Sequence, residues 1–299
     1  MKKVFSLVLA GLLVAGMAVA TSAAFQAEED LQNISFDIHR INATWTPDGE
    51  WSDGEYAPVD VKNTWISAAT NDEANLDAAK NLDFKLGMSY DDQYVYGYVQ
   101  FVDANGHDNA WDDEAGSMWY SGALQINFSD ADEAGDQRLE YGIGLTNNGK
   151  KITNTWGDYI GGGYEAADAD WTCDVEGDTV TYEFRTPFSA FSDSVKGKEG
   201  DKLGFCLVIS WGNEQDYIHT QLASGCTGDP GKAADNYAKV TLGDQIVVET
   251  AAPETEAPEV VDAAAASTTT EAPKTFDAGI IAAVAAIVSA AGYAIAKKH

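Results

Sequence analysis

The chain has 299 residues, of which 48 are acidic and 18 basic, so its formal net charge at pH 7 is −30. Proteins bind nucleic acids and acidic lipid headgroups through clustered lysine and arginine, so this charge excludes a nucleic-acid-binding role. Apolar residues make up 45% of the chain and aromatic residues 11%, which predicts a folded protein. Four histidines and three cysteines leave little material for a soft-metal or redox centre.

Residues 1–24 have the pattern of a secretory signal peptide. A start with two lysines is followed by an apolar run over 4–20 and by small residues at 21–24, the order that export and cleavage require. Acidic residues come next, rather than the basic residues that would stop transfer of a first transmembrane helix. The sequence therefore predicts an exported protein.

A second apolar run, residues 278–296, is followed by Lys297, Lys298 and His299. A helix of this length spans about 28 Å, close to the hydrocarbon thickness of a bilayer. We expect a transmembrane anchor over 278–299 that keeps its lysines in the cytoplasm and displays the rest outside. A buried globular helix is the alternative.

The segment before this run indicates surface display. Ala272-Pro273-Lys274-Thr275-Phe276 resembles the Leu-Pro-x-Thr-Gly sorting signal of Gram-positive surface proteins in its proline and threonine, although the flanking Leu and Gly are absent. Residues 245–277 are rich in Ala, Thr, Glu and Pro, which predicts an extended, solvated spacer. We expect the protein on the extracellular face of the cell membrane, or on the cell wall, of a bacterium.

Residues 30–244 read as one folded domain made of strands. Val180, Tyr182 and Phe184 alternate with polar residues and so share one face of a strand. Turn sequences such as Asp48-Gly49 separate the runs. This pattern predicts an all-β, antiparallel, jelly-roll-like β-sandwich, with a short helix or loop at 72–80. The predicted strands are Ile34–His39, Phe84–Ser89, Tyr94–Val102, Ala123–Phe128, Leu139–Leu145, Thr179–Thr186, Leu203–Ser210 and Tyr237–Leu242.

Cys173, Cys206 and Cys226 form an odd set for an exported chain. One disulfide with one buried thiol, or three unpaired thiols, are both compatible with the sequence. The apolar run around Cys206 favours simple burial of that thiol.

The sequence contains no common catalytic motif. A Gly-x-Ser-x-Gly elbow, a His-Glu-x-x-His pair and a Cys-x-x-Cys pair are absent. Acidic pairs such as Asp112 and Asp113 could form a glycosidase couple, but so acidic a chain contains such pairs by chance. We expect a protein that is not an enzyme.

A polar loop over 103–120 carries aromatic residues that no strand alternation places in a core. Tryptophan and tyrosine offer flat apolar faces with a polar edge, which suits stacking on a sugar ring, while carboxylates and amides bind its hydroxyl groups. Further tryptophans lie in other predicted loops, although Trp119 could instead cap the core. The candidate ligand-binding residues are Trp119, Trp111, Trp211, Tyr120, Trp156, Asp103 and Gln125.

Carboxylate-rich loops also suggest Ca²⁺, which takes six to eight oxygen ligands. Asp91-Asp92 and the run Asp130-Ala131-Asp132-Glu133 are the candidates. The spacing of an EF-hand is absent, so solvated acidic turns are the alternative.

The order of motifs resembles that of family 9 carbohydrate-binding modules and the related DOMON-like sandwiches. The resemblance covers residues 34–244 and implies a β-sandwich that grips sugar between tryptophans, with structural Ca²⁺ in some members. The motifs are the opening Asp48–Tyr56, Tyr94-Val95-Tyr96 with Val102-Asp103, Trp119–Ile126, and Gly228-Asp229-Pro230 with Tyr237–Leu242.

Carried over by position, Trp119 forms one wall of the sugar site and Gln125 stands where a glutamate is usual. Gly122 replaces the usual aspartate. The second wall normally precedes the Asp-Pro pair, where this chain has no aromatic residue. Either Trp211 or Trp156 substitutes for it, or the chain no longer binds sugar in that way.

The sequence thus predicts a surface-anchored, non-catalytic protein that binds carbohydrate through loop tryptophans. One alternative is a structural or adhesive surface protein with a protein partner. Another is a haem-binding DOMON domain, because such relatives use a methionine and a histidine, and Met88, His107 and His219 are present.

Overall fold

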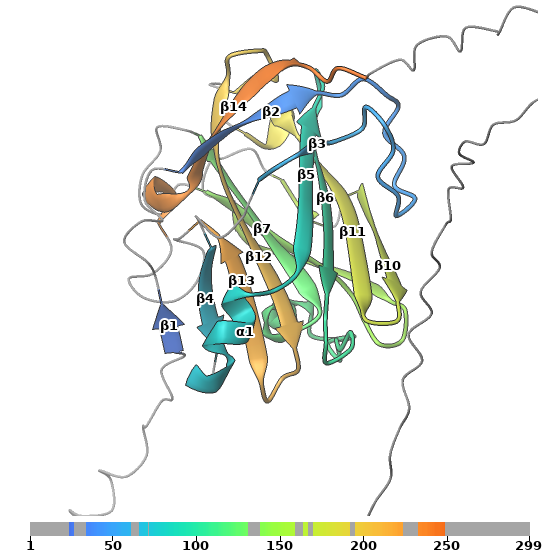
Figure 1. Ribbon diagram of the computed structural model, residues 1–299, viewed down its shortest axis with the longest axis vertical. Helices are drawn as coiled ribbons and strands as arrows, with labels where there is room; N and C mark the ends of the chain where they lie inside the picture. The colour runs from blue at the N-terminus through green and yellow to red at the C-terminus, as the bar shows by residue number, and fades with distance from the viewer. Residues whose placement is uncertain are drawn as a thin grey trace, which may run out of the picture. The chain divides into compact units, whose positions relative to one another are not determined.

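The computed structural model describes residues 24–26, 34–60, 66–70, 72–130, 138–158, 164–166, 170–191, 195–223 and 233–248. Its strands form one 14-stranded mixed sheet that curls into two packed layers (Figure 1). The strands are β1 (Ala24–Gln26), β2 (Ser35–Arg40), β3 (Ala57–Pro58), β4 (Ile66–Thr70), β5 (Phe84–Tyr90), β6 (Tyr94–Val102), β7 (Ala123–Asp130), β8 (Leu139–Leu145), β9 (Lys151–Asp158), β10 (Asp170–Glu176), β11 (Thr179–Pro187), β12 (Lys202–Gly212), β13 (Tyr217–Leu222) and β14 (Ala238–Gln245).

The helical elements are short. They are η2 (Glu73–Asn75), α1 (Leu76–Lys80), η3 (Ala115–Tyr120), η5 (Phe188–Ala190) and η6 (Ala234–Asn236). The predicted short helix at 72–80 is confirmed as η2 followed by α1, and the Asp72 carboxylate caps it by accepting the Ala74 N–H at 2.9 Å. Such a side-chain acceptor satisfies an N–H that has no partner within the helix.

One layer contains β14, β2, β5, β6, β11 and β10 in that order, with β3 beside β5. The other contains β4, β13, β12, β7, β8 and β9, with β1 on the outer edge of β4. We call them the β6 layer and the β7 layer. Strand β12 belongs to both, because Lys202–Phe205 pairs with β14, Leu207–Gly212 pairs with β13, and its other edge pairs with β7.

The sandwich is mixed rather than purely antiparallel, so that part of the predicted fold class is wrong. Strand β2 runs parallel to both of its neighbours, β14 and β5. Parallel neighbours need a long connection, and the chain between β2 and β5 passes through β3, β4 and α1 before it returns. Turn signals in a sequence indicate hairpins and say nothing of such crossovers.

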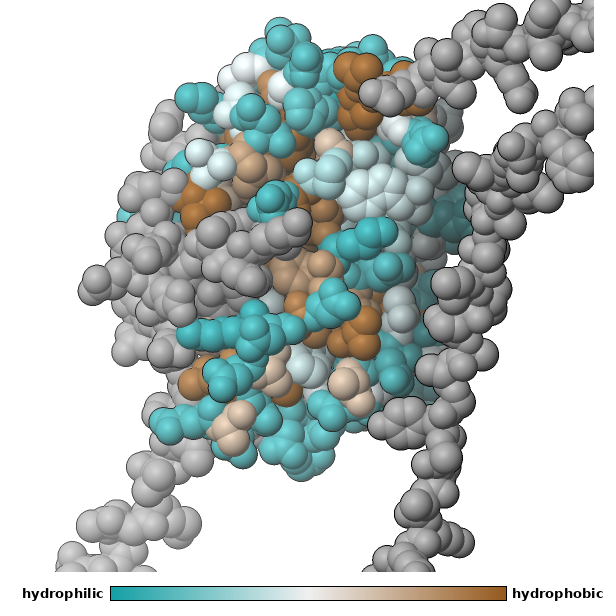
Figure 2. Space-filling model, viewed as in Figure 1, coloured by the Kyte–Doolittle hydropathy of each residue, from teal (hydrophilic) through white to brown (hydrophobic). Residues whose placement is uncertain are grey.

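Apolar residues from alternate positions of both layers fill the core between them. Val180, Tyr182 and Phe184 are fully buried there, as their spacing predicts. Among the described residues, the large apolar side chains that are exposed are Val102, Val247 and Val248. Figure 2 accordingly shows hydrophilic residues over much of the described surface in that view, with apolar residues between them.

The predicted boundaries of β6 and β8 are confirmed at both ends. Strands β1, β3, β4, β9, β10 and β13 were not predicted from the sequence. Strand β9 reads Lys-Ile-Thr-Asn-Thr-Trp-Gly-Asp, in which polar residues and a glycine mask the alternation. Its pairing with β8 shifts register between Glu140 and Tyr141, so a strict period of two does not hold along it.

Cys206 is bonded in a disulfide, whereas Cys173 is a free thiol. The expectation that Cys206 is simply buried is therefore wrong: an apolar strand buries a disulfide as readily as a thiol. The predicted signal peptide before residue 24, the spacer after residue 248 and the anchor over 278–299 lie outside the described residues. Within the described part, no helix is long and apolar enough to cross a membrane.

Candidate functional site

Aromatic rings gather on the outer face of the β7 layer, the face that points away from the core. Trp119 and Tyr120, both on η3, stack with ring centroids 3.8 Å apart, and Trp111 stacks on Tyr120 at 5.5 Å. Tyr217 of β13 meets Trp119 and Tyr120 edge-on, and His219 meets Trp119 in the same way at 5.9 Å. We call these five residues the aromatic cluster; all but His219 are partly exposed.

A buried histidine ties η3 to the sheet. His219 Nε2 lies 2.6 Å from the Trp119 carbonyl oxygen, so its N–H donates to that carbonyl. Burial lowers the pKa of His219 to about 4, because the charged imidazolium loses its hydration. The ring is therefore neutral at pH 7, and it fixes the backbone that carries the two stacked rings.

A chain of buried polar side chains lies on the same face, beside the aromatic cluster. Gln125 Nε2 donates to Glu140 Oε1 at 2.6 Å, and Arg138 binds Glu140 Oε2 through Nε at 2.8 Å and a terminal nitrogen at 2.7 Å. All three are at most 5% exposed. Burial of an ion pair requires such hydrogen bonding to offset its desolvation. We call these three residues the polar row.

Strand register places the polar row next to the aromatic cluster. Ser210 of β12 pairs with both Ala123 and His219, and Val208 pairs with both Gln125 and Gln221. Directly paired residues share a face, and positions two apart along a strand are about 7 Å from each other. The aromatic cluster therefore borders a row of buried polar side chains that are bonded to one another.

Trp156 packs against the cluster from β9 rather than from a loop. Its ring lies over Gly142, where a Cβ atom would come within 2.5 Å of it, and its Nε1 donates to the Gly116 carbonyl of η3 at 3.1 Å. Trp156 and Trp111 both pack on a small apolar cluster that contains Met118. The structure thus brings together four of the five predicted aromatic residues around η3.

Trp211 lies in the core, so the prediction that places it at a loop edge is wrong. It is 5% exposed, and its Nε1 donates to Thr220 Oγ1 at 3.2 Å. Strand β12 continues to Gly212, beyond the predicted end at Ser210. Trp211 therefore follows Leu207 and Ile209 on the face that points to the core.

Asp103 is also buried, at the end of β6. Its Oδ1 accepts the Asn105 N–H at 3.0 Å and closes a turn, and its exposure is 0%. Burial raises the pKa of this carboxyl. Besides its own turn, Asp103 contacts the Asp178 carbonyl through its backbone N–H at 2.8 Å, and its carboxyl contacts the Gly212 backbone.

Sequence reasoning missed Tyr217 and His219, together with Arg138 and Glu140. The signal for the first two is the alternation Tyr217-Ile218-His219-Thr220-Gln221, in which the odd positions share a face once the segment is recognised as a strand.

The haem ligands that the sequence allows do not converge. Met88 is part of the core, whereas His219 lies on the outer face of the β7 layer, so a sheet separates them. The Nε2 of His107 lies 2.6 Å from the Leu145 carbonyl oxygen.

Asp91 and Asp92 bind protein groups rather than forming an open cation site. Asp91 accepts hydrogen bonds from the N–H groups of Gln93 and Tyr94 and from the Tyr96 hydroxyl, and Asp92 pairs with Arg40 at 2.8 Å. In the part of the chain that the structure describes, no three His, Cys, Asp or Glu residues come together as a metal site; the candidates Asp132 and Glu133 lie outside it.

No family model and no curated protein sequence matches the chain. Among solved structures, it is similar to a family 9 carbohydrate-binding module from Caldicellulosiruptor kristjanssonii in complex with glucose, at 14% identity and a TM-score of 0.48, over 72% of this chain and 100% of that one. It is similar to such a module from the same organism in complex with cellotriose at 14% identity and a TM-score of 0.49, over 73% and 100%. Both TM-scores are below 0.5, so function is inferred below from the residues of this chain.

Proposed function

We propose that this protein is a non-catalytic, surface-displayed carbohydrate-binding protein whose aromatic cluster contacts a sugar, with the buried polar row fixing the sheet beside it. The observation that carries the proposal is their position: partly exposed rings of Trp119, Tyr120 and Tyr217 are fixed beside the hydrogen-bonded Gln125–Glu140 pair on one sheet face.

The partly exposed rings of the aromatic cluster match the two surfaces of a pyranose. The apolar C–H face of the sugar needs a flat apolar partner, and an indole or phenol ring supplies one together with a polar edge. The hydroxyl edge needs donors and acceptors, which the hydroxyl groups of Tyr120 and Tyr217 and the indole N–H of Trp119 supply, since these three residues are partly exposed. Tyr120 stacks on both Trp119 and Trp111, so the sugar would contact the ring faces that these two stacks leave uncovered.

Surface display is part of the proposal and rests on the sequence. The signal peptide, the acidic spacer and the C-terminal apolar run with its basic end are the supporting features. Cell fractionation and protease treatment of intact cells test this part: loss of the domain from intact cells supports display, and its full protection contradicts it.

Affinity electrophoresis of the full-length protein through gels that contain different polysaccharides tests the binding. The matched variants are Trp119→Ala and Trp45→Ala, because Trp45 is a partly exposed tryptophan on the β6 layer. We expect a polysaccharide that retards the wild type and the Trp45 variant. Trp119→Ala should weaken binding by about 1–3 kcal/mol, by analogy with aromatic stacking on nucleic-acid bases. A folded wild type that no polysaccharide retards, or equal effects of the two substitutions, would contradict the proposal.

A further inference from the structure

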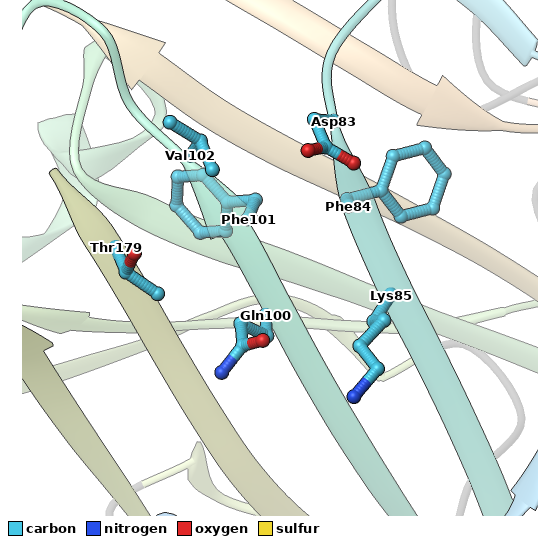
Figure 3. A pocket seen from close by; sticks show the side chains of 7 residues that line it. All are labelled: Asp83, Phe84, Lys85, Gln100, Phe101, Val102 and Thr179. Carbon is cyan, nitrogen blue, oxygen red and sulfur yellow. The ribbon is translucent and has the colours of Figure 1, made fainter. Parts of the chain in front are cut away.

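A hollow of about 180 Å³ opens on the outer face of the β6 layer, away from the aromatic cluster. Lys85 of β5 and Gln100 of β6 are directly paired, and their side chains reach to the same side of the two strands (Figure 3). Thr179 of β11 and Asp83, which precedes β5, complete its polar lining. Three neighbouring strands thus present hydrogen-bonding groups to one small space.

Two of the polar groups that line this hollow, the Lys85 ammonium and the Gln100 amide oxygen, can form further hydrogen bonds. Lys85 forms no ion pair with a described residue, although the chain carries a net charge of −30. Gln100 Nε2 donates to the Tyr98 hydroxyl at 3.0 Å and to Thr181 Oγ1 at 3.1 Å. These two bonds fix the amide and leave its oxygen without a donor among the described residues, so it is an oriented acceptor.

A tryptophan ring lies beside the hollow. Trp51 rests on Gly87, where a Cβ atom would lie 2.5 Å from the ring, and Gly87 is two residues along β5 from Lys85. Tyr56 and Tyr98 hold the ring edge-on at 5.6 and 5.2 Å, and the Lys85 ammonium lies 5.4 Å from its centroid. The ring is partly exposed and fixed in place.

From this arrangement we infer a second carbohydrate contact site, specific for a neutral pyranose residue, formed by Lys85, Gln100, Thr179 and Trp51. A ligand that satisfies an ammonium, an amide oxygen and a carboxylate must both donate and accept hydrogen bonds, as a polyol does. Asp83 and the charge of the whole chain repel an anionic sugar. The inference rests on the proposed function, because the pyranose is a residue of the same class of polysaccharide.

The two sites lie on opposite outer faces of the sandwich, which allows them to contact two different polysaccharide chains. On an insoluble glycan, a second weak contact raises the overall avidity without any new high-affinity site.

The experiment is a ¹H–¹⁵N NMR titration of the full-length protein with methyl glycosides of glucose, galactose, mannose and xylose, and with methyl glucuronide. It compares wild type, Trp119→Ala and the double variant Trp119→Ala/Lys85→Gln, with Trp119→Ala/Lys198→Ala as the control, because Lys198 is an exposed lysine in another turn. We expect a neutral glycoside to shift the Gln100 side-chain amide in the Trp119→Ala protein. Lys85→Gln should weaken the affinity for this glycoside about tenfold, since a hydrogen bond to a charged group contributes a free energy that corresponds to about that factor. The Lys198 control should leave the affinity unchanged.

Three other results would overturn the inference, and the NMR shifts distinguish them from one another. Shifts confined to residues around Trp119 refute the second site and leave the proposed function intact. Tighter binding of the glucuronide at Gln100 refutes the neutral class. Absence of shifts at both places with every glycoside refutes the inference and the proposed function together.

Discussion

Glu183 is the buried carboxylate that holds the segment 41–58 against the β6 layer, and its replacement by glutamine should change how stability depends on pH. Its oxygens accept hydrogen bonds from the Gly49 N–H and from the Tyr56 hydroxyl, the latter at 2.7 Å. The Trp45 indole donates in turn to that hydroxyl at 2.6 Å. Burial of the side chain, which is 0% exposed, raises the pKa of Glu183 from 4.5 to about 7.

The sign of the effect follows from proton binding. Between pH 4.5 and 7 the folded protein holds a proton on Glu183 that the unfolded chain releases. The free energy of unfolding therefore falls as pH rises through this window, and the loss is complete above the folded pKa. The interval from 4.5 to about 7 corresponds to about 3 kcal/mol.

Urea denaturation of the wild type and of Glu183→Gln at pH 4 to 8 measures how the free energy of unfolding depends on pH. Glutamine keeps the shape and an acceptor oxygen but cannot ionise. The stability of the variant relative to wild type should rise by about 3 kcal/mol between pH 4 and pH 8. Glu176→Gln removes the same charge from an exposed position on β10 and should show a much smaller rise. A difference between Glu183→Gln and wild type that stays constant with pH would refute the reasoning.

Three further predictions concern the site and the thiol. Gly142→Ala should displace the Trp156 ring, lower stability by about 1–3 kcal/mol through overpacking and shift the tryptophan fluorescence; unchanged fluorescence and stability would contradict the contact seen here. The pKa of His219 is lowered to about 4, so NMR titration should find the ring neutral at pH 5, and its contribution to stability should be lost as pH falls from 6.5 towards 4; a midpoint near 6.5 would show that the ring is not buried. Cys173 is partly buried, which raises its pKa to about 12, so Ellman's reagent should react with this thiol much faster after denaturation than before; equal rates in the native and denatured protein would contradict this.

The β-sandwich architecture and most strands follow from the sequence, because alternation is strong where one face of a strand is buried. Strands β6 and β8 have such alternation, and their boundaries are predicted without error. Strand β13 is short and contains His219, Thr220 and Gln221, whose burial depends on neighbours that the local sequence does not reveal. The parallel pairing of β2 depends on contacts between residues about 200 positions apart, which no local pattern encodes.

The candidate site was predicted only in part, because local sequence patterns do not reveal contacts with distant segments. The loop aromatics Trp111, Trp119 and Tyr120 do meet, because they are close in sequence and share η3 or its entry. The prediction for Trp211 was wrong because β12 extends two residues beyond its predicted end, which places the Trp211 side chain in the core instead of in a loop. Arg138 and Glu140 were missed because charged residues on a β-strand usually indicate a solvated face, whereas here the two charges pair with each other under cover.

The sharing of β12 between the two layers has a consequence for how the protein comes apart. Each layer would lose a hydrogen-bonded neighbour if the other unfolded, since β14 and β13 occupy successive halves of one edge of this strand. Partial melting of a single layer is therefore costly, and the domain should unfold as one cooperative unit. The backbone amides of β12 should then exchange with deuterated solvent only as fast as the whole domain opens.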